Sequence, residues 1–400
     1  MSSKVLVFEA YPFFSGSQRI TLNVCRILKK NGFHVTLLLV DDRFGSLRKN
    51  FEPVVDEIEL INASEHLLTY GDEDSWFSKK KFFKSVFGGL LPFYFNCLKQ
   101  INSKKYDFLY CCDPRGATMM LLSAKLFRKK SILHFHGKNR LPNKLAKLFL
   151  NTFDTVACVS GDVARSLPEA GNKVVIYNGI DFSQYSNVDL SAVRNEVGHE
   201  SVNTAVKFLY VGLLRPHKGL HHLIHAFAKL KKERPDQDFV LYVLGAAKTQ
   251  AEENFKKILS DFSEKNSITK NIHWLGWKDN VLAWMNYADY FVFPSIDKED
   301  NTFEGFGAKI ESTEGLPTVL IESSICKLYS IASTVTGVSE IITPGKNGEL
   351  YNSNEPDALY NSLNTVLSDL PKFKDFETGE NFHLSTFENK ILSLFDSKKK

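Results

Sequence analysis

Residues 207–219 have the sequence KFLYVGLLRPHKG, and this stretch decides the fold. The apolar run in Lys207–Val211 predicts a buried strand, and the apolar spacing in Leu220–Lys232 predicts an amphipathic helix. A strand followed directly by a helix is typical of βαβ units, which build parallel sheets.

The turn between this strand and this helix holds two cations, Arg215 and Lys218. Free amides at the helix N-terminus and the positive end of the helix dipole favour an anion there. Both cations can add charge-assisted hydrogen bonds. The turn therefore predicts a diphosphate site. The alternative is a loop in which both cations are solvated.

The same alternation extends along the chain in both directions. In the first half, strands are predicted at Val5–Phe8, Val35–Val40, Phe108–Cys112, Ile132–Phe135, Thr155–Ser160 and Val174–Tyr177. In the second half, they are predicted at Phe239–Leu244, Ile272–Leu275, Tyr290–Pro294, Ser330–Ala332 and Glu349–Tyr351. Predicted helices between them include Ala117–Phe127, Lys144–Phe153, Ala251–Glu264, Val281–Tyr287 and Thr318–Cys326. We therefore expect an α/β fold with two doubly wound, Rossmann-like domains.

The chain length supports two domains, because 400 residues exceed one ordinary core. We expect them at residues 1–185 and 200–375, joined by the polar stretch 181–203, with residues 376–400 as a C-terminal extension. Facing domains of this kind share a ligand site at the carboxyl ends of their strands.

Positive charge is concentrated in one region. The net charge of the whole chain is only +4, but residues 75–153 hold 16 lysines and arginines and two acids. At its start, aromatic and basic residues alternate in a patch of Trp76, Phe77, Lys79, Lys80, Lys81 and Lys84. This composition suits the headgroup zone of an anionic membrane. A buried aromatic helix with solvated lysines is the alternative, while nucleic acid is disfavoured because base-reading motifs are missing.

The cysteine pattern and the start of the chain indicate a protein of a reducing compartment. The six cysteines form no C-x-x-C pair, which argues against a zinc site or a disulfide framework. The first residues lead straight into a strand, so we predict no signal peptide. No apolar stretch reaches the roughly 18–20 residues that span a bilayer. We expect a cytoplasmic protein, soluble or peripheral on the cytoplasmic face of a membrane.

A second motif, EGLPTVLIE at residues 314–322, places Glu314 and Glu322 eight residues apart around a helix start. The amides of Thr318 and Val319 can hold a phosphate there. One carboxylate could then accept sugar hydroxyls and the other ribose hydroxyls. A capped helix with two surface acids is the alternative.

Taken together, these motifs resemble the retaining glycosyltransferases of the GT-B fold, in glycosyltransferase family 4. The resemblance spans nearly the whole chain and thins between about residues 41 and 105. Besides the two motifs above, it rests on Gly16, Gly32–Val35, His136-Gly137, Val159-Ser160, Asn178–Asp181, Ile272–Gly276, Ala288–Tyr290, Pro294-Ser295, Gly337–Glu340 and Gly345–Gly348.

The resemblance implies a role for each candidate site residue. Arg215 and Lys218, in the turn that begins at Gly212, would bind the donor diphosphate and stabilise the leaving group. Glu314 would hold the transferred hexose and Glu322 the ribose. On the N-terminal, acceptor-side domain, Gly16 would allow close approach to the donor and His136 would lie at the reaction centre. The C-terminal helix near 382–395 would cross back to that domain.

The implied activity is the transfer of a hexose from a nucleotide-sugar to a hydroxyl of a glycan or lipid-linked glycan, in bacterial surface polysaccharide synthesis. A UDP-sugar is the favoured donor, and no metal or other cofactor is expected. Rival functions are a nucleotide-sugar epimerase or phosphorylase of the same fold, or a non-catalytic, membrane-docked partner subunit.

Three positions depart from the family pattern: Pro317 and Lys327 stand where glycine is common, and Tyr329 where proline is common. A nearby EGFG at residues 304–307 matches the motif that is common in the family, but no glutamate follows it eight residues after Glu304. Two histidine groups were weighed as metal ligands. His134 and His136 lack a third ligand, and His217, His221 and His225 are interpreted as a solvated helix face.

Overall fold

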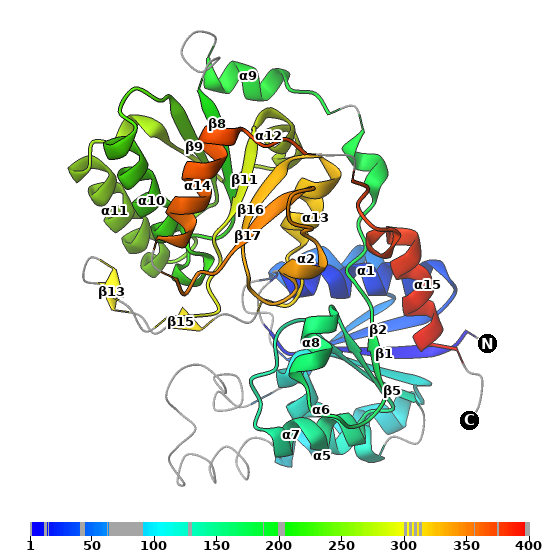
Figure 1. The fold of residues 1–400 in the computed structure, drawn as a ribbon. Helices are drawn as coiled ribbons and strands as arrows, with labels where there is room; N and C mark the ends of the chain where they lie inside the picture. The colour runs from blue at the N-terminus through cyan, green and yellow to red at the C-terminus, as the bar shows by residue number, and fades with distance from the viewer. Residues whose placement is uncertain are drawn as a thin grey trace. The chain divides into compact units, whose positions relative to one another are not determined.

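The computed structural model describes residues 2–11, 14, 16–40, 45–61, 63, 91–126, 130–186, 188–198, 205–299, 302–303, 306–307, 310–311, 314–355, 357–373 and 376–396. The chain divides into two compact units, residues 1–179 with 384–400 and residues 180–383 (Figure 1). Each unit is built on one parallel sheet with helices on both faces. This is the doubly wound α/β architecture that the alternation of strands and helices predicts.

The first unit contains a seven-stranded parallel sheet in the order β3-β2-β1-β4-β5-β6-β7. Its strands are β1 (Lys4–Glu9), β2 (His34–Leu39), β3 (Glu57–Leu60), β4 (Phe108–Cys112), β5 (Lys130–Phe135), β6 (Thr155–Cys158) and β7 (Lys173–Val175). Strands β4 and β6 are buried along their whole length, and β1 and β5 are buried except at their first residue, as apolar runs in a sheet covered on both faces must be. The strand order changes direction between β1 and β4, where the carboxyl ends of strands commonly form ligand sites.

Helices cover both faces of this sheet. They are α1 (Gly16–Lys30), α2 (Ser46–Phe51), α5 (Leu91–Lys104), α6 (Asp113–Leu126), α7 (Asn143–Thr152), α8 (Gly161–Ser166) and α15 (Leu384–Leu394). On one face, α1, α2 and α15 share a hydrophobic core with β1, β2 and β4. Asn31, just after α1, donates to Glu388 of α15 at 3.1 Å, so the last helix of the chain packs on the first. Burying each large apolar side chain here contributes about 1.5–3 kcal/mol.

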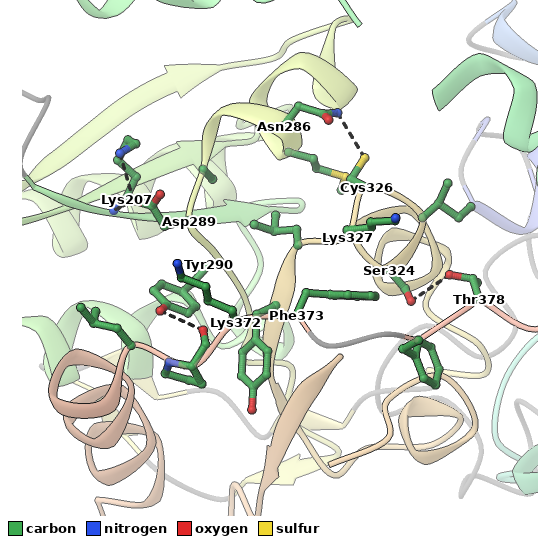
Figure 2. Close-up of a pocket in the computed structure, with 18 of the residues that line it drawn as sticks. Lys207, Asn286, Asp289, Tyr290, Ser324, Cys326, Lys327, Lys372, Phe373 and Thr378 are labelled. Carbon is green, nitrogen blue, oxygen red and sulfur yellow. Dashed lines mark hydrogen bonds and ion pairs between the residues drawn. The ribbon is translucent and has the colours of Figure 1, made fainter. Parts of the chain in front are cut away.

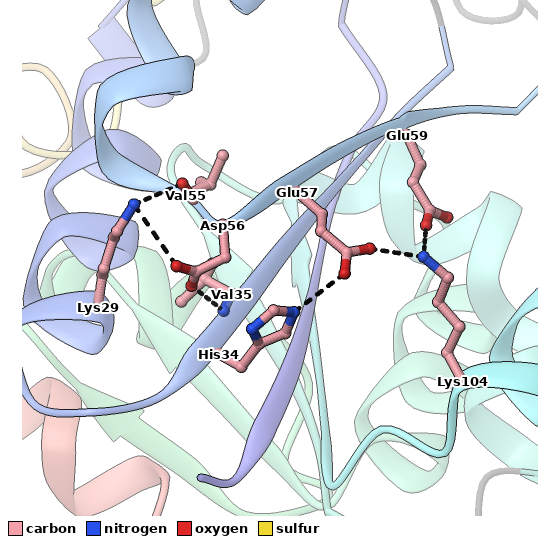
Figure 3. Close-up of polar contacts among 8 residues, drawn as sticks. All are labelled: Lys29, His34, Val35, Val55, Asp56, Glu57, Glu59 and Lys104. Atoms are coloured by element: carbon pink, nitrogen blue, oxygen red, sulfur yellow. Dashed lines mark hydrogen bonds and ion pairs between the residues drawn. The ribbon is translucent and has the colours of Figure 1, made fainter.

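Hydrogen bonds and ion pairs of charged side chains link strands β2 and β3 of this unit to each other and to the neighbouring helices (Figure 3). The Asp56 carboxylate accepts the amide of Val35 at 2.8 Å and pairs with Lys29 at 3.5 Å. The ammonium of Lys104, at the end of α5, contacts the carboxylates of both Glu57 and Glu59. Strand β3, which has acids at alternate positions, was missed by the sequence analysis, and these contacts explain why acids occur there.

The second unit contains a six-stranded parallel sheet in the order β10-β9-β8-β11-β16-β17. These strands are β8 (Val206–Val211), β9 (Phe239–Leu244), β10 (Ile272–Gly276), β11 (Tyr290–Phe293), β16 (Tyr329–Ser333) and β17 (Gly348–Tyr351). All six were predicted to within two residues. Four two-residue strands, β12 (Lys298–Glu299), β13 (Thr302–Phe303), β14 (Phe306–Gly307) and β15 (Ile310–Glu311), form two small antiparallel pairs.

The helices of this unit are α9 (Ser191–Val197), α10 (Leu220–Glu233), α11 (Gln250–Lys265), α12 (Val281–Tyr287), α13 (Thr318–Ile325) and α14 (Ala358–Asp369). The main core of the unit lies between one face of the sheet and α10, α11 and α14. The stretch 181–203, predicted as a connection, contains a short 3₁₀ turn, Phe182–Tyr185, and helix α9.

Candidate active site

The turn after β8 is held in place by close backbone packing. A 3₁₀ turn, Pro216–Lys218, follows the strand, and Gly219 then begins α10 with a positive φ of 70°. A Cβ at Gly219 would lie 1.8 Å from the carbonyl oxygen of Pro294, so only glycine fits. Ile296 donates its amide to the carbonyl of His217 at 2.9 Å. The predicted anion turn is therefore fixed against the loop that follows β11.

Arg215 is oriented by a carboxylate that the sequence analysis missed. Its Nε donates to Oε1 of Glu252 at 2.6 Å, and the Glu252 side chain is only 5% exposed. Burial is the largest single influence on Glu252 and opposes its charge, but Arg215 and the backbone amides of Lys248 and Thr249 together outweigh burial and lower the pKa of Glu252 below the usual value. Glu252 also forms a capping box with Thr249 at the start of α11. The Thr-x-x-Glu pattern in the sequence predicts that cap, but not the contact with Arg215.

Lys218 contacts one of the two motif carboxylates directly. Its ammonium lies against Oε1 of Glu314, and the hydroxyl of Ser295 donates to the same oxygen at 3.5 Å. Burial is the largest single influence and disfavours the Glu314 carboxylate, but the charge and hydrogen bond of Lys218, with smaller contributions from His217 and Ser295, together lower the pKa of Glu314. Both side chains are mostly buried, at 24% and 14% exposed. Two residues 96 positions apart in the chain thus form one ion pair.

The motif helix α13 begins one residue after Pro317, whose carbonyl accepts the amide of Leu320 at 3.0 Å. The amides of Thr318 and Val319 are the first of this helix and have no partner within it. A Cβ at Gly337 would lie 2.2 Å from the carbonyl oxygen of Gly315, so a second close approach fixes the loop before the helix. Glu322 lies inside α13 and is partly buried.

The second unit therefore brings several of the predicted residues together. Arg215 and Lys218 lie in the turn that follows β8 and Gly212, and the pair of Lys218 with Glu314 links that turn to the loop before α13. Two cations and a helix start can hold a diphosphate, and a carboxylate beside them can accept hydroxyl hydrogen bonds.

Gly16 and His136 lie in the first unit. Gly16 is the first residue of α1, and no described atom lies within 4 Å of where its Cβ would stand. His136 follows β5, and its imidazole lies 4.3 Å, centre to centre, from that of His134. His134 in turn shares a 2.5 Å hydrogen bond with the hydroxyl of Tyr110. Burial lowers the pKa of His136 to about 4, so its ring is neutral at pH 7.

Several predicted features have other outcomes. The patch of Trp76, Phe77, Lys79, Lys80, Lys81 and Lys84 lies outside the described residues. The interpretation of His221 as solvated was wrong, because it is 3% exposed and packs edge-on against Phe255 of α11.

Among the residues that the structure describes, no group of three or more His, Cys, Asp or Glu side chains could hold a metal ion. Within the same residues, no helix combines the length and hydrophobicity that crossing a bilayer requires.

Two α/β units, each built on a parallel sheet, form the architecture of the GT-B glycosyltransferases, and one of them carries a cationic turn beside a carboxylate. Family models support this directly. The model described as "Glycosyltransferase Family 4" matches residues 14–184, and the model "Glycosyl transferases group 1" matches residues 194–379. The chain belongs to the family 4 glycosyltransferases.

Individual relatives agree with this family. An uncharacterised glycosyltransferase of Methanocaldococcus jannaschii is 29% identical over 93% of this chain and 90% of its own length. A UDP-Gal:α-D-GlcNAc-diphosphoundecaprenol α-1,3-galactosyltransferase of Escherichia coli is 21% identical over 92% of this chain and 88% of its own. The crystal structure of Anabaena HepE in complex with UDP and glucose shares the fold, with a TM-score of 0.72, 18% identity and coverage of 98% and 99% of the two chains.

Proposed function

We propose that this glycosyltransferase is a retaining hexosyltransferase. It moves a hexose from a UDP-sugar to a hydroxyl of a glycan or lipid-linked glycan at the cytoplasmic face of a bacterial membrane. The observation that carries the proposal is the pairing of Lys218 with Glu314 beside Arg215. This arrangement offers positive charge for a diphosphate in the turn after β8, and a carboxylate for sugar hydroxyls in the loop before α13.

The proposed roles of Arg215 and Lys218 follow from the charge that develops on the donor during the reaction. When the bond between sugar and diphosphate breaks, negative charge grows on the diphosphate oxygens, and fixed cations stabilise that charge most in a site that excludes water. Arg215 is held by the buried Glu252, so little reorganisation is needed when the donor binds. Lys218 is paired with Glu314 before the donor arrives, and its ammonium is then shared with the diphosphate.

Relatives support the donor class and suggest the acceptor. The E. coli relative is described as using UDP-Gal and a diphosphoundecaprenol-linked sugar, and the Anabaena structure contains UDP and glucose. A lipid-linked acceptor also gives the basic, aromatic patch at residues 76–84 a role at an anionic membrane.

A donor panel tests the reaction. UDP-, GDP- and ADP-hexoses are incubated with the protein, with and without lipid extract, and released nucleotide diphosphate is measured. We expect UDP release that depends on the extract, and NMR of the product should show the anomeric configuration of the donor. Change of the free donor without any acceptor would identify an epimerase, and turnover that needs inorganic phosphate would identify a phosphorylase. No turnover with any donor would favour the non-catalytic subunit.

A second experiment tests the membrane contact. Replacing Lys79, Lys80, Lys81 and Lys84 by alanine should weaken binding to anionic vesicles without slowing hydrolysis of a soluble UDP-sugar. The matched control replaces four exposed lysines of the second unit, Lys232, Lys257, Lys265 and Lys270. Equal loss of vesicle binding in both variants would show that only net charge matters, and the patch would then have no special role.

A further inference from the structure

A cavity of about 1060 Å³ opens in the second unit at the amino ends of strands β8, β11 and β16 (Figure 2). The turn with Arg215 and Lys218 follows the carboxyl end of β8, so the cavity lies at the other edge of this sheet. One wall is formed by the ends of α12 and α13, and another by the segment that follows α14. We call it the amino-edge cavity. Its volume is in the range of sites that bind small molecules.

Three lysines line the amino-edge cavity, and among the described residues only Lys207 forms an ion pair. Lys207 forms an ion pair with Asp289 at 3.0 Å, and Asp289 also accepts the backbone amide of Lys207 at 2.8 Å. Lys327 and Lys372 line the cavity from opposite walls, and their side chains extend to opposite sides in Figure 2; among the described residues neither forms an ion pair. The remaining acid of the lining is Glu377, at the rim. Two ammonium groups with no described counter-charge favour an anionic guest.

Lys327 occupies a backbone position that favours glycine. Its φ is +56°, in the left-handed region, where side chains other than glycine, asparagine and aspartate are rare. The residue ends the turn after α13, where its amide donates to the carbonyl of Ser324 at 3.1 Å. Glycine would make this turn without strain, so the turn itself does not require a lysine. A ligand that uses the side chain would explain its presence.

The rest of the lining is aromatic and neutral. Phe373 and Phe376 pack edge to face with ring centres 6.0 Å apart, and both rings are partly exposed beside Lys372. Burial raises the pKa of the Cys326 thiol to about 12, so the thiol adds no negative charge at pH 7. Ser324 of α13 and Thr378 of the segment after α14 join the two walls, because their hydroxyls are hydrogen-bonded to each other at 2.9 Å. The lining thus offers cations, hydroxyls and apolar rings together.

We propose that the amino-edge cavity is a second ligand site, which binds a phosphate ester carrying an apolar group. Lys327 and Lys372 hold the phosphate, and Phe373 and Phe376 contact the apolar part. Lysine binds phosphate as a point charge and needs no fixed geometry, which fits two flexible side chains from opposite walls. The site is separate from the turn with Arg215 and Lys218, which we call the donor turn after its proposed role, and does not depend on the reaction proposed above.

Phenyl phosphate is the soluble probe, because it joins one phosphate to one apolar ring. Its binding is measured by saturation-transfer NMR with UDP present in excess, so that the donor turn is occupied. We expect Lys327→Gly combined with Lys372→Ala to weaken binding at least tenfold. The control, Lys265→Ala with Lys270→Ala, removes the same charge from the end of α11 and from the 3₁₀ turn Thr269–Asn271 that follows it, and should bind like the unchanged protein. Lys218→Ala should also leave this binding intact, which separates the site from the donor turn.

Stability distinguishes a binding role from a structural one. Lys327→Gly puts glycine at a left-handed backbone position, which removes the strain of a lysine there. The melting temperature of this variant should therefore equal or exceed that of the unchanged protein, even though binding is lost. Equal binding of phenyl phosphate by the double variant and the unchanged protein would overturn the proposal, as would no binding by either.

Vesicles identify the source of the phosphate. The background is the variant in which Lys79, Lys80, Lys81 and Lys84 are alanine, so that this patch does not contribute. Vesicles with 30% phosphatidic acid in phosphatidylcholine are mixed with this background variant and with a version that also carries Lys327→Gly and Lys372→Ala. Tighter vesicle binding by the variant that keeps both lysines would show that the natural ligand is a lipid phosphate. Equal vesicle binding, together with lost phenyl phosphate binding, indicates a free phosphorylated molecule.

Discussion

Glu252 accepts hydrogen bonds from Arg215 and from the start of α11 at the same time: its Oε1 accepts from Nε of Arg215 at 2.6 Å, while its Oε2 accepts from the backbone amides of Lys248 at 2.6 Å and Thr249 at 3.1 Å. The same carboxylate therefore caps α11 and orients Arg215. Among described residues, the two Nη groups of Arg215 have no acceptor, so they remain available for a diphosphate.

Replacing Glu252 should therefore affect both stability and catalysis. In Glu252→Ala we expect the free energy of unfolding to fall by about 1 kcal/mol, because the cap is lost. We also expect kcat/KM for the donor to fall about tenfold, equivalent to about 1.4 kcal/mol, because Arg215 is no longer oriented. Thr249→Ala is the matched control, since it removes the other half of the capping box and leaves Arg215 paired. If Thr249→Ala lowered kcat/KM as much as Glu252→Ala, the orienting role of Glu252 would be wrong.

Lys218 and Glu314 allow a second prediction, because each is mostly buried and neutralises the other. Lys218→Met should abolish transfer and also lower the free energy of unfolding by about 1–3 kcal/mol, since a buried carboxylate loses its partner. Adding Glu314→Gln should restore most of that stability but none of the transfer. Urea unfolding and donor turnover of both single variants and the double variant check this. Recovery of turnover in the double variant would contradict the assignment of Lys218 to the diphosphate.

The fold and the position of the cationic turn could be predicted because they depend on local patterns. The six strands of the second unit are apolar runs with turn residues at their ends, and Arg215 and Lys218 follow one of them directly. Long-range partners could not be predicted. Glu252 has the signature of a cap, and nothing local indicates that Arg215 reaches it across 37 residues. Similarly, His221 lies on a face of α10 that looks polar in sequence but is covered by α11.

A matched pair of glycines tests how tightly the donor turn is packed. Gly219 and Gly345 both have positive φ, 70° and 75°. A Cβ at Gly219 would collide with the carbonyl of Pro294, whereas one at Gly345 would meet nothing within 4 Å. Gly345→Ala should cost about 1 kcal/mol, the backbone term alone. Gly219→Ala should cost more than about 3 kcal/mol, because the backbone must also move. Urea unfolding of the two variants measures the difference, and equal costs would show that the turn can relax away from Pro294.

His136 makes stability depend on pH in a direction that can be worked out. Burial lowers its pKa in the folded chain to about 4, whereas an unfolded histidine has a pKa of about 6.5. Above about pH 6.5 both states are neutral and the histidine has no effect. As the pH falls towards 4, the unfolded chain takes up a proton that the folded chain does not, and stability falls by up to about 1.4 kcal/mol per pH unit.

Replacing His136 by glutamine should therefore flatten the dependence of unfolding free energy on pH between about 6.5 and 4. Part of the slope should remain, because burial also lowers the pKa of the neighbouring His134. His222→Gln, in the second unit, controls for the loss of a histidine elsewhere. A slope unchanged by His136→Gln would mean that the imidazole is hydrated and can be charged in the folded protein. His136 could then carry a proton at pH 6, whereas the neutral ring has no proton to spare for a general acid at that pH.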